Sequence, residues 1–187
     1  MADYSVRGSI AAMEEYSVET VAADIIVNAN ESNYPIPEEI GAKITELANG
    51  FPFNRYPPMK SENLGAVIAK EFDVDPSCVV ISNGSSELLE KVCYTFGGSG
   101  KKIAVPWPSF SMYMEYAELA DSIPVRYPLT ADGYVDADVV IDVCKKEKPA
   151  LLIICNPNNP TGNYNELSVI EKIIANVDCP IVMDEAY

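Results

Sequence analysis

The feature that most constrains the fold is an alternation of apolar and helical segments after residue 78. Short apolar runs typical of strands occupy residues 79–82, 102–105, 123–127, 151–155 and 180–183. Segments with the helical spacing of apolar residues lie between these runs, at 86–96, 110–120, 137–146 and 166–176. Apolar strands separated by helices indicate a parallel sheet covered on both faces. We therefore predict an α/β fold, a three-layer αβα arrangement around a mostly parallel sheet.

The first 78 residues are less regular. Residues 1–34 have the pattern of an irregular N-terminal arm, and we expect the main domain to cover 35–187. Helical spacing appears at 37–47 and again at 62–72. The segment between these helices contains Pro52, Pro57 and Pro58. Proline interrupts both helices and strands, so we expect a loop there.

Charge and histidine content exclude several classes of function. The 187-residue chain carries a net charge of −15 and has no histidine. The negative charge argues against binding to nucleic acid or to an anionic membrane, because both require clustered Lys and Arg. The lack of histidine excludes Ser-His-Asp and Cys-His nucleophiles and most catalytic zinc sites. We expect no metal site.

The cysteines and the N-terminus suggest a compartment. The five cysteines form no C-x-x-C pair, which favours reduced and mostly buried thiols; they are Cys78, Cys93, Cys144, Cys155 and Cys179. Residues 1–16 mix charges along their length and lack the apolar region of a signal peptide. No apolar run approaches the ~20 residues that a membrane span requires. We therefore expect a cytoplasmic protein.

Two motifs follow the last two predicted strands, where ligands of parallel sheets collect. The run N-P-N-N-P-T-G begins at Asn156, and its prolines and glycine predict a rigid loop that presents amide groups. Asp184 follows the final strand. A buried carboxylate there is costly unless paired, and a protonated ring nitrogen would be a suitable partner. Tyr187 is close enough in sequence to reach the same flat ligand; the alternative role of Asp184 is a helix cap.

Two other strand ends carry motifs with two interpretations each. The run N-G-S-S-E at 83–87 opens a helix whose free N–H groups and dipole suit a phosphate, or it is a plain capped helix. Phe110 in the run P-W-P-S-F either stacks on a planar ligand or packs in the core.

Taken in order, these motifs resemble those of fold-type I pyridoxal phosphate (PLP)-dependent aminotransferases, in particular the histidinol-phosphate aminotransferase branch. The matching runs are V-R-G-S-I-A-A-M-E-E-Y (6–16), V-N-A-N-E-S-N-Y-P (27–35), N-R-Y-P (54–57), N-G-S-S-E (83–87), P-S-F-S-M-Y (108–113), N-P-N-N-P-T-G (156–162) and D-E-A-Y (184–187). The resemblance covers nearly the whole chain. It implies PLP as cofactor, a small-molecule substrate and the large-domain fold of these transferases.

The resemblance assigns roles around the cofactor ring. Asp184 would pair with the pyridine nitrogen, and Tyr187 and Asn159 would hydrogen-bond the phenolic oxygen. Asp184 and Tyr187 are thus the expected catalytic residues of this chain. Phe110 would stack on the ring, where the family commonly has tyrosine.

Further roles lie around the phosphate and the substrate. Ser85 and Ser86 would donate hydrogen bonds to the cofactor phosphate. Tyr56 would reach the phosphate of the partner subunit's cofactor, which implies a homodimer. Tyr16 and Asn30 would line the substrate side. The chain departs from the family's common runs at N-E-S-N (30–33) and G-S-S-E (84–87), departures that bear on the substrate more than on the cofactor.

The resemblance also implies that part of the enzyme is absent from this chain. None of the ten lysines follows a sixth strand, where the family places the lysine that binds the cofactor covalently. We expect residues 35–187 to be the N-terminal part of the PLP-binding large domain, truncated before its last strands, with the small domain absent. Two of those strands would separate 79–82 from 180–183.

The expected function is transamination by the complete protein, with this chain inactive alone. The expected substrates are L-histidinol phosphate and 2-oxoglutarate, which places the enzyme in histidine biosynthesis. Within the family, an aromatic aminotransferase or a threonine-phosphate decarboxylase remains open. A second class of interpretation is a non-catalytic remnant that acts as a cofactor-binding or association module.

Overall fold

The computed structural model describes residues 5–13, 22–25, 27, 31–56 and 62–187. The chain divides into two compact units, one formed by Met1–Glu14 with Ser82–Tyr187 and the other by Glu15–Ile81. The expected boundary between an arm and a main domain at residue 34 falls inside the second unit and stays a prediction.

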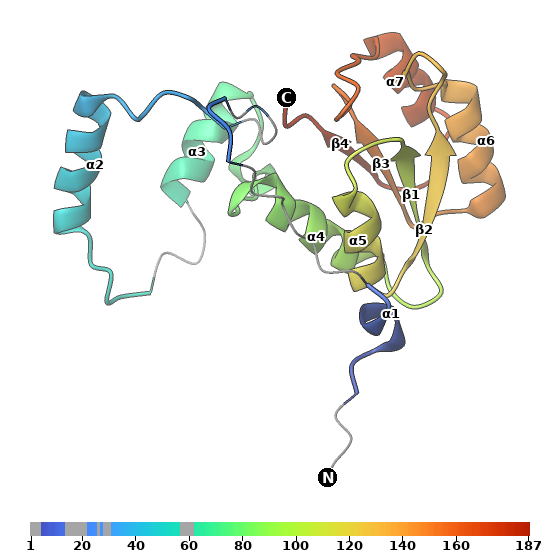
Figure 1. The fold of residues 1–187 in the computed structure, drawn as a ribbon, viewed down its shortest axis with the longest axis horizontal. Helices are drawn as coiled ribbons and strands as arrows, with labels where there is room; N and C mark the ends of the chain where they lie inside the picture. The colour runs from blue at the N-terminus through green and yellow to red at the C-terminus, as the bar shows by residue number, and fades with distance from the viewer. Residues whose placement is uncertain (1–4, 14–21, 26, 28–30, 57–61) are drawn as a thin grey trace. The chain divides into compact units, whose positions relative to one another are not determined.

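A four-stranded parallel sheet forms the centre of the first unit (Figure 1). Its strands are β1 (Lys102–Trp107), β2 (Ile123–Pro128), β3 (Leu151–Cys155) and β4 (Ile181–Asp184). Their order is β2-β1-β3-β4, so β4 lies at one edge. Every strand of this sheet matches one that the sequence predicts to within three residues at each end, and all pairings are parallel as predicted.

Helices cover both faces of the sheet, which confirms the three-layer αβα arrangement (Figure 1). The helices of this unit are α1 (Gly8–Ala11), α4 (Gly84–Phe96), α5 (Met112–Leu119), α6 (Ala137–Glu147) and α7 (Leu167–Ile174). Side chains of α4 and α5 pack on one face of the sheet, and those of α6 and α7 pack on the other.

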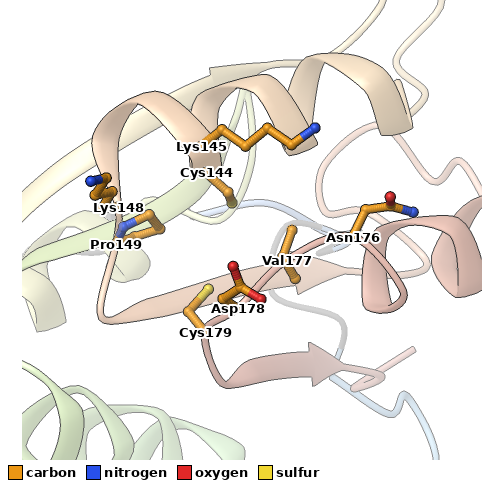
Figure 2. A pocket seen from close by; sticks show the side chains of 8 residues that line it. All are labelled: Cys144, Lys145, Lys148, Pro149, Asn176, Val177, Asp178 and Cys179. Atoms are coloured by element: carbon orange, nitrogen blue, oxygen red, sulfur yellow. The ribbon is translucent and has the colours of Figure 1, made fainter.

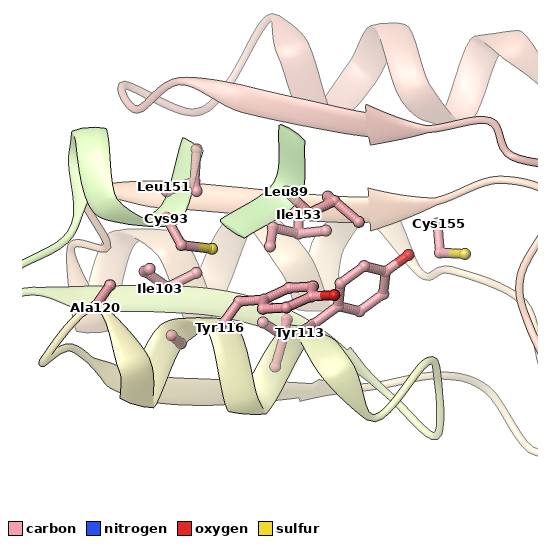
Figure 3. Close-up of a cluster of buried hydrophobic side chains, with 11 residues drawn as sticks. Leu89, Cys93, Ile103, Tyr113, Tyr116, Ala120, Leu151, Ile153 and Cys155 are labelled. Atoms are coloured by element: carbon pink, nitrogen blue, oxygen red, sulfur yellow. The ribbon is translucent and has the colours of Figure 1, made fainter. Parts of the chain in front are cut away.

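The alternation of side chains along β3 divides the core between the two faces. Ile153 points to the face that α4 and α5 cover, where it packs with Tyr113 and Cys93 (Figure 3). Leu152 and Ile154 point to the opposite face. All five residues of β3 are buried, as expected for a central parallel strand that is covered on both sides.

The second unit contains α2 (Glu38–Gly50), α3 (Glu62–Glu71) and the short 3₁₀ helix η1 (Pro76–Cys78). Both α-helices begin within one residue of the predicted positions. The apolar residues of α2, Ile40, Ile44 and Leu47, are exposed. No helix among the described residues is both long and apolar enough to cross a membrane.

The predicted strand at residues 79–82 does not form. Val79 has an extended backbone, but Val80 is 70% exposed and no described residue pairs with this segment in a ladder. Extended backbone becomes a strand only when a neighbour satisfies its N–H and C=O groups. The resemblance implies two other strands beside this segment, and the described sheet contains neither.

The buried position of Ile153 predicts a large effect of truncation on stability. Replacing Ile153 with alanine removes a fully buried side chain and should lower the free energy of unfolding by about 2–5 kcal/mol. Ile174→Ala is the matched control, because Ile174 in α7 is 56% exposed, and it should cost less than about 1 kcal/mol. Urea denaturation of the intact protein measures both. Equal losses would contradict the assignment of β3 to the centre of the core.

Candidate cofactor site

The two motif-bearing strand ends lie side by side. Cys155, the last residue of β3, is in register with Asp184, the last residue of β4. The backbone N–H of Asn156 donates to the carbonyl oxygen of Asp184 at 3.0 Å. The N-P-N-N-P-T-G loop therefore starts directly beside Asp184.

Asn158 fixes the loop to the segment that follows β1. Its side chain is 2% exposed, and its amide nitrogen donates to the carbonyl of Pro108 at 3.3 Å and to Oγ1 of Thr161 at 2.9 Å. The hydroxyl of Ser109 donates to its amide oxygen at 2.7 Å. The side chain of Asn158 thus supports the loop from within.

A second pair of buried asparagines fixes the start of the loop to the segment that follows it. Oδ1 of Asn156 accepts a hydrogen bond from the backbone N–H of Asn165 at 2.7 Å, and its Nδ2 donates to the carbonyl of Asn165 at 3.2 Å. Asn165 in turn accepts from the backbone N–H of Val135 at 2.8 Å. The prediction of a rigid loop agrees with these contacts, but the sequence pattern gave no role to Asn165.

Asp184 is half-buried and has two partners in the described residues. Its Oδ2 accepts a hydrogen bond from the hydroxyl of Tyr113 at 2.6 Å, and its Oδ1 accepts from the N–H of Ala186 at 3.1 Å. Burial, together with the hydrogen bond to Asp184, raises the pKa of Tyr113 far above its usual value. Tyr113 therefore keeps its proton and acts as a permanent donor to Asp184.

Tyr113 is the site residue that the sequence reasoning missed. It lies in the matching run P-S-F-S-M-Y, but the sequence analysis gave it no role of its own. Phe110 contacts its ring edge to face, with ring centres 5.5 Å apart. Phe110, just before α5, and Tyr113, in its first turn, thus place an aromatic ring next to the phenol that donates to Asp184.

Asn159 and Tyr187 come together beside these groups. Nδ2 of Asn159 lies 3.4 Å from the hydroxyl oxygen of Tyr187. Asn159 is half-buried and Tyr187 is 58% exposed, so both side chains retain accessible polar atoms. Two adjacent donors suit a single anionic oxygen on a flat ligand.

The N-terminus of α4 leaves donors free for an anion. The side chain of Asn83 makes no capping hydrogen bond, and Ser85 and Ser86 are exposed. Gly84 has a φ of +78°, a left-handed conformation that glycine adopts without strain and that places the chain at the start of the helix. The first-turn N–H groups and the helix dipole favour a phosphate at such a position.

Glu87 stabilises the turn before α4. Its carboxylate accepts hydrogen bonds from the hydroxyl of Ser82 and from the backbone N–H of Asn83, the latter at 2.7 Å, and it pairs with Lys91. These contacts, that with Lys91 first, lower the pKa of Glu87 to about 2. The ionised carboxylate of Glu87 therefore stabilises the turn at neutral pH. This stabilisation is lost as the pH falls from 4.5 toward 2 and the carboxylate takes up a proton.

Three predicted residues are not placed relative to this site. Tyr56 belongs to the second unit and is 99% exposed. Tyr16 and Asn30 lie outside the described residues. Their roles stay predictions. Within the described part of the chain, no group of three or more Cys, Asp or Glu residues could hold a metal ion.

Two of the three arginines have structural partners. Arg7 donates to the carbonyl of Leu119 at 2.7 Å, and the guanidinium of Arg126 lies 4.0 Å from the centre of the Trp107 ring. Neither contact lies within the set of site residues above. Within the first unit, the described site therefore contains no arginine for an acidic group of a substrate.

The groups described above form a complementary set for one kind of ligand. A carboxylate, an aromatic ring, a pair of amide and phenol donors, and a helix N-terminus suit a flat ring that carries a protonated nitrogen, an oxygen anion and a phosphate. The sheet places Asp184 beside the loop that carries Asn159, and Asn159 lies next to Tyr187; their roles toward a cofactor stay predictions.

The loop anchor predicts a stability difference between two asparagines. Asn165→Ala leaves the buried N–H of Val135 without its acceptor and removes one hydrogen bond to Oδ1 of Asn156, which should lower the free energy of unfolding by about 1–3 kcal/mol. Asn176→Ala, at an exposed position, should change it by about 0.5 kcal/mol or less. Equilibrium denaturation of the intact protein compares them. Similar values for the two variants would show that Asn165 is not an anchor.

The contact between Tyr113 and Asp184 makes a separate prediction. Tyr113→Phe removes a hydrogen bond to a charged group, with an expected loss of about 1.5–3 kcal/mol in unfolding free energy. Tyr116→Phe is the control, because Tyr116 is buried on the same helix and its hydroxyl makes no hydrogen bond to the described residues. If Tyr116→Phe lowers the free energy of unfolding as much as Tyr113→Phe does, the effect comes from packing and not from the hydrogen bond to Asp184.

Comparison with known proteins gives a consistent result. The family described as Aminotransferase class I and II matches residues 23–187. The histidinol-phosphate aminotransferase of Thermoanaerobacter sp. (strain X514) is 34% identical over 187 residues, which cover 100% of this chain and 53% of that protein. An aromatic amino acid aminotransferase of Cutibacterium acnes is 34% identical over 164 residues, 86% of this chain and 46% of that protein.

The fold also matches solved structures. The crystal structure of histidinol-phosphate aminotransferase from Sinorhizobium meliloti, in complex with pyridoxal-5'-phosphate, superposes with a TM-score of 0.85 at 18% identity. The match covers 100% of this chain and 52% of that chain. The present chain spans about half the length of the relatives it matches.

Proposed function

Since this chain belongs to the class I and II aminotransferase family, we propose that it forms part of a PLP-dependent enzyme that transfers the amino group of L-histidinol phosphate to 2-oxoglutarate. The observation that carries the proposal is the half-buried carboxylate of Asp184, which receives a hydrogen bond from the buried Tyr113 beside the Asn159–Tyr187 pair.

The residues present fit the cofactor. Tyr113 and the N–H of Ala186 each donate one hydrogen bond to Asp184, which leaves further lone pairs on its carboxylate for the pyridine N–H. Asn159 and Tyr187 offer donors for the phenolic oxygen. Phe110 offers an aromatic ring at the same strand end.

The phosphate has its own binding position in this proposal. Ser85 and Ser86 supply hydroxyl groups and first-turn N–H groups at the start of α4, where the helix dipole favours negative charge. The carboxylate of Glu87 accepts hydrogen bonds from Ser82 and from the backbone N–H of Asn83, which stabilises the turn before these serines. A phosphate held there would fix the position of the ring independently of the residues that contact the ring nitrogen and the phenolic oxygen.

When bound, PLP supplies the electron sink that accepts the electron pair left by removal of the substrate α-proton. Asp184 keeps the pyridine nitrogen protonated, because a carboxylate beside an N–H⁺ favours its charged form. Tyr113 holds the carboxylate in place through its hydrogen bond to Oδ2. Tyr187 and Asn159 orient the ring through its phenolic oxygen.

The proton transfer itself needs a residue that this chain does not contain. The family binds its cofactor covalently through a lysine after a sixth strand, and none of the ten lysines here has that position. We therefore place the covalent attachment and the α-proton transfer in a part of the protein outside these 187 residues. The arginines for the acid groups of the substrate belong to the same part.

The choice of substrate rests on the relatives and on three residues of the N-terminal part. The histidinol-phosphate aminotransferases match the whole chain. We propose that Tyr16 and Asn30 line the substrate side, and that Tyr56 reaches the phosphate in the partner subunit of a homodimer. We also propose a cytoplasmic location. The relative named an aromatic amino acid aminotransferase supports aromatic amino acids as the second candidate donor.

Replacement of Asp184 tests the proposed chemistry. In the intact enzyme, Asp184→Ala should reduce kcat by about 10³-fold or more, because the ring nitrogen loses the group that keeps it charged. Cofactor affinity should change far less, because the phosphate contacts persist. Glu185→Ala is the matched control, since Glu185 is an exposed neighbouring carboxylate. Turnover in Asp184→Ala equal to that of the control would refute the role.

A panel of amino donors tests the substrate. We expect kcat/KM of the intact enzyme to be highest for L-histidinol phosphate with 2-oxoglutarate as acceptor. Phenylalanine and tyrosine represent the second candidate, and phosphothreonine tests decarboxylation. Faster turnover of the aromatic donors would show that the substrate is an aromatic amino acid. The proposed cofactor site would still hold.

A further inference from the structure

A second site lies at the opposite ends of the strands from Asp184. Cys144 is in the last turn of α6, and Cys179 lies two residues before β4. Both line a cavity of about 330 Å³ together with Lys145 and Lys148 (Figure 2). The cavity is therefore at the amino ends of β3 and β4, away from the groups proposed to bind PLP.

The two cysteines line the same cavity and pack in the same core cluster. Cys144 is buried, and the half-buried Cys179 packs against the core cluster that contains it. The neighbouring thiol lowers the pKa of Cys179 and raises that of Cys144. Cys179 is also the more accessible of the two, so it is the better placed to react as a thiolate, with Cys144 as its neighbour.

The charge around the cavity is locally positive. Lys145 and Lys148 are exposed and line it, and Asp178 is the single carboxylate among the lining residues. The chain as a whole has a net charge of −15, but exposed charges are screened over about 8 Å at physiological ionic strength. Nearby lysines therefore dominate the potential that a small ligand meets at the cavity.

We propose that Cys179 and Cys144 form a thiol–disulfide exchange site for small anionic disulfides, with Cys179 as the nucleophile and Cys144 as the resolving thiol. The thiolate of Cys179 attacks one sulfur of the incoming disulfide. A bond forms between Cys179 and that sulfur, and the other half leaves as a thiolate with the electron pair of the broken S–S bond and takes up a proton.

The second step completes the exchange. Cys144 loses its proton to solvent and attacks the sulfur of Cys179, and the remaining half of the small disulfide leaves as a thiol. The two cysteines are oxidised to one disulfide, and the small disulfide is reduced to two thiols. The product links the C-terminal turn of α6 to the residues before β4.

The other cysteines differ from this pair. Cys93 is fully buried, and burial raises its pKa to about 11. Cys155 is buried at the end of β3, where its thiol donates to the carbonyl of Pro157 at 3.3 Å. Cys78 is exposed and belongs to the other unit. Among the described cysteines, the pair alone combines access, a neighbouring thiol and nearby cations.

Peptide mapping tests the site in the intact protein. The protein is treated with glutathione disulfide, its remaining thiols are alkylated, and a tryptic digest is analysed by mass spectrometry. Lysines separate Cys144, Cys155 and Cys179 into different tryptic peptides. We expect a disulfide-linked pair of the peptides that carry Cys144 and Cys179. Cys144→Ser should instead retain glutathione on Cys179, because the resolving thiol is missing.

Charge and control variants complete the test. Lys145→Gln with Lys148→Gln should slow the reaction with glutathione disulfide several-fold and leave the reaction with uncharged hydroxyethyl disulfide unchanged. Cys78→Ser should not alter the formation of the linked peptides. Absence of the linked peptides in the wild-type protein, or modification of Cys78 while Cys179 stays free, would overturn the proposal.

Discussion

The parallel pairing of β3 with β4 is the constraint on which the site depends. It places Cys155 opposite Asp184 and lets the N–H of Asn156 donate to the carbonyl of Asp184 at 3.0 Å. A shift of one residue in this register would turn every side chain of β4 to the other face of the sheet. Asp184 would then leave the face on which Tyr113 lies.

The polar groups around this pairing are of two kinds. Asn156, Asn158 and Asn165 are buried and satisfied within the protein, so they determine the course of the loop. Asn159 and Tyr187 keep accessible polar atoms and are free to bind a ligand. Buried polar groups cost free energy unless they are hydrogen-bonded, which is why the first kind forms closed networks.

The sequence was most informative where local pattern and burial agree. The run at 151–155 is apolar at every position and forms a strand with the predicted bounds, because a fully covered central strand has no polar face. The run at 79–82 has a similar pattern but forms no strand, because a pattern cannot show whether a partner is present. Asp184 and Asn159 were predicted from their motifs, whereas Tyr113 depends on a contact across 71 positions of sequence. Such a contact leaves no periodic signal.

The edge position of β4 has a consequence for assembly. No described strand pairs with its outer side, so a row of backbone donors and acceptors faces outward immediately next to Asp184. Such a row acts as a template on which another extended polypeptide can be ordered. A strand added there in parallel would carry its own carboxyl end to the same edge as Asp184. We propose that a further strand of the same domain pairs with this edge, which would bring the residues that follow that strand close to Asp184.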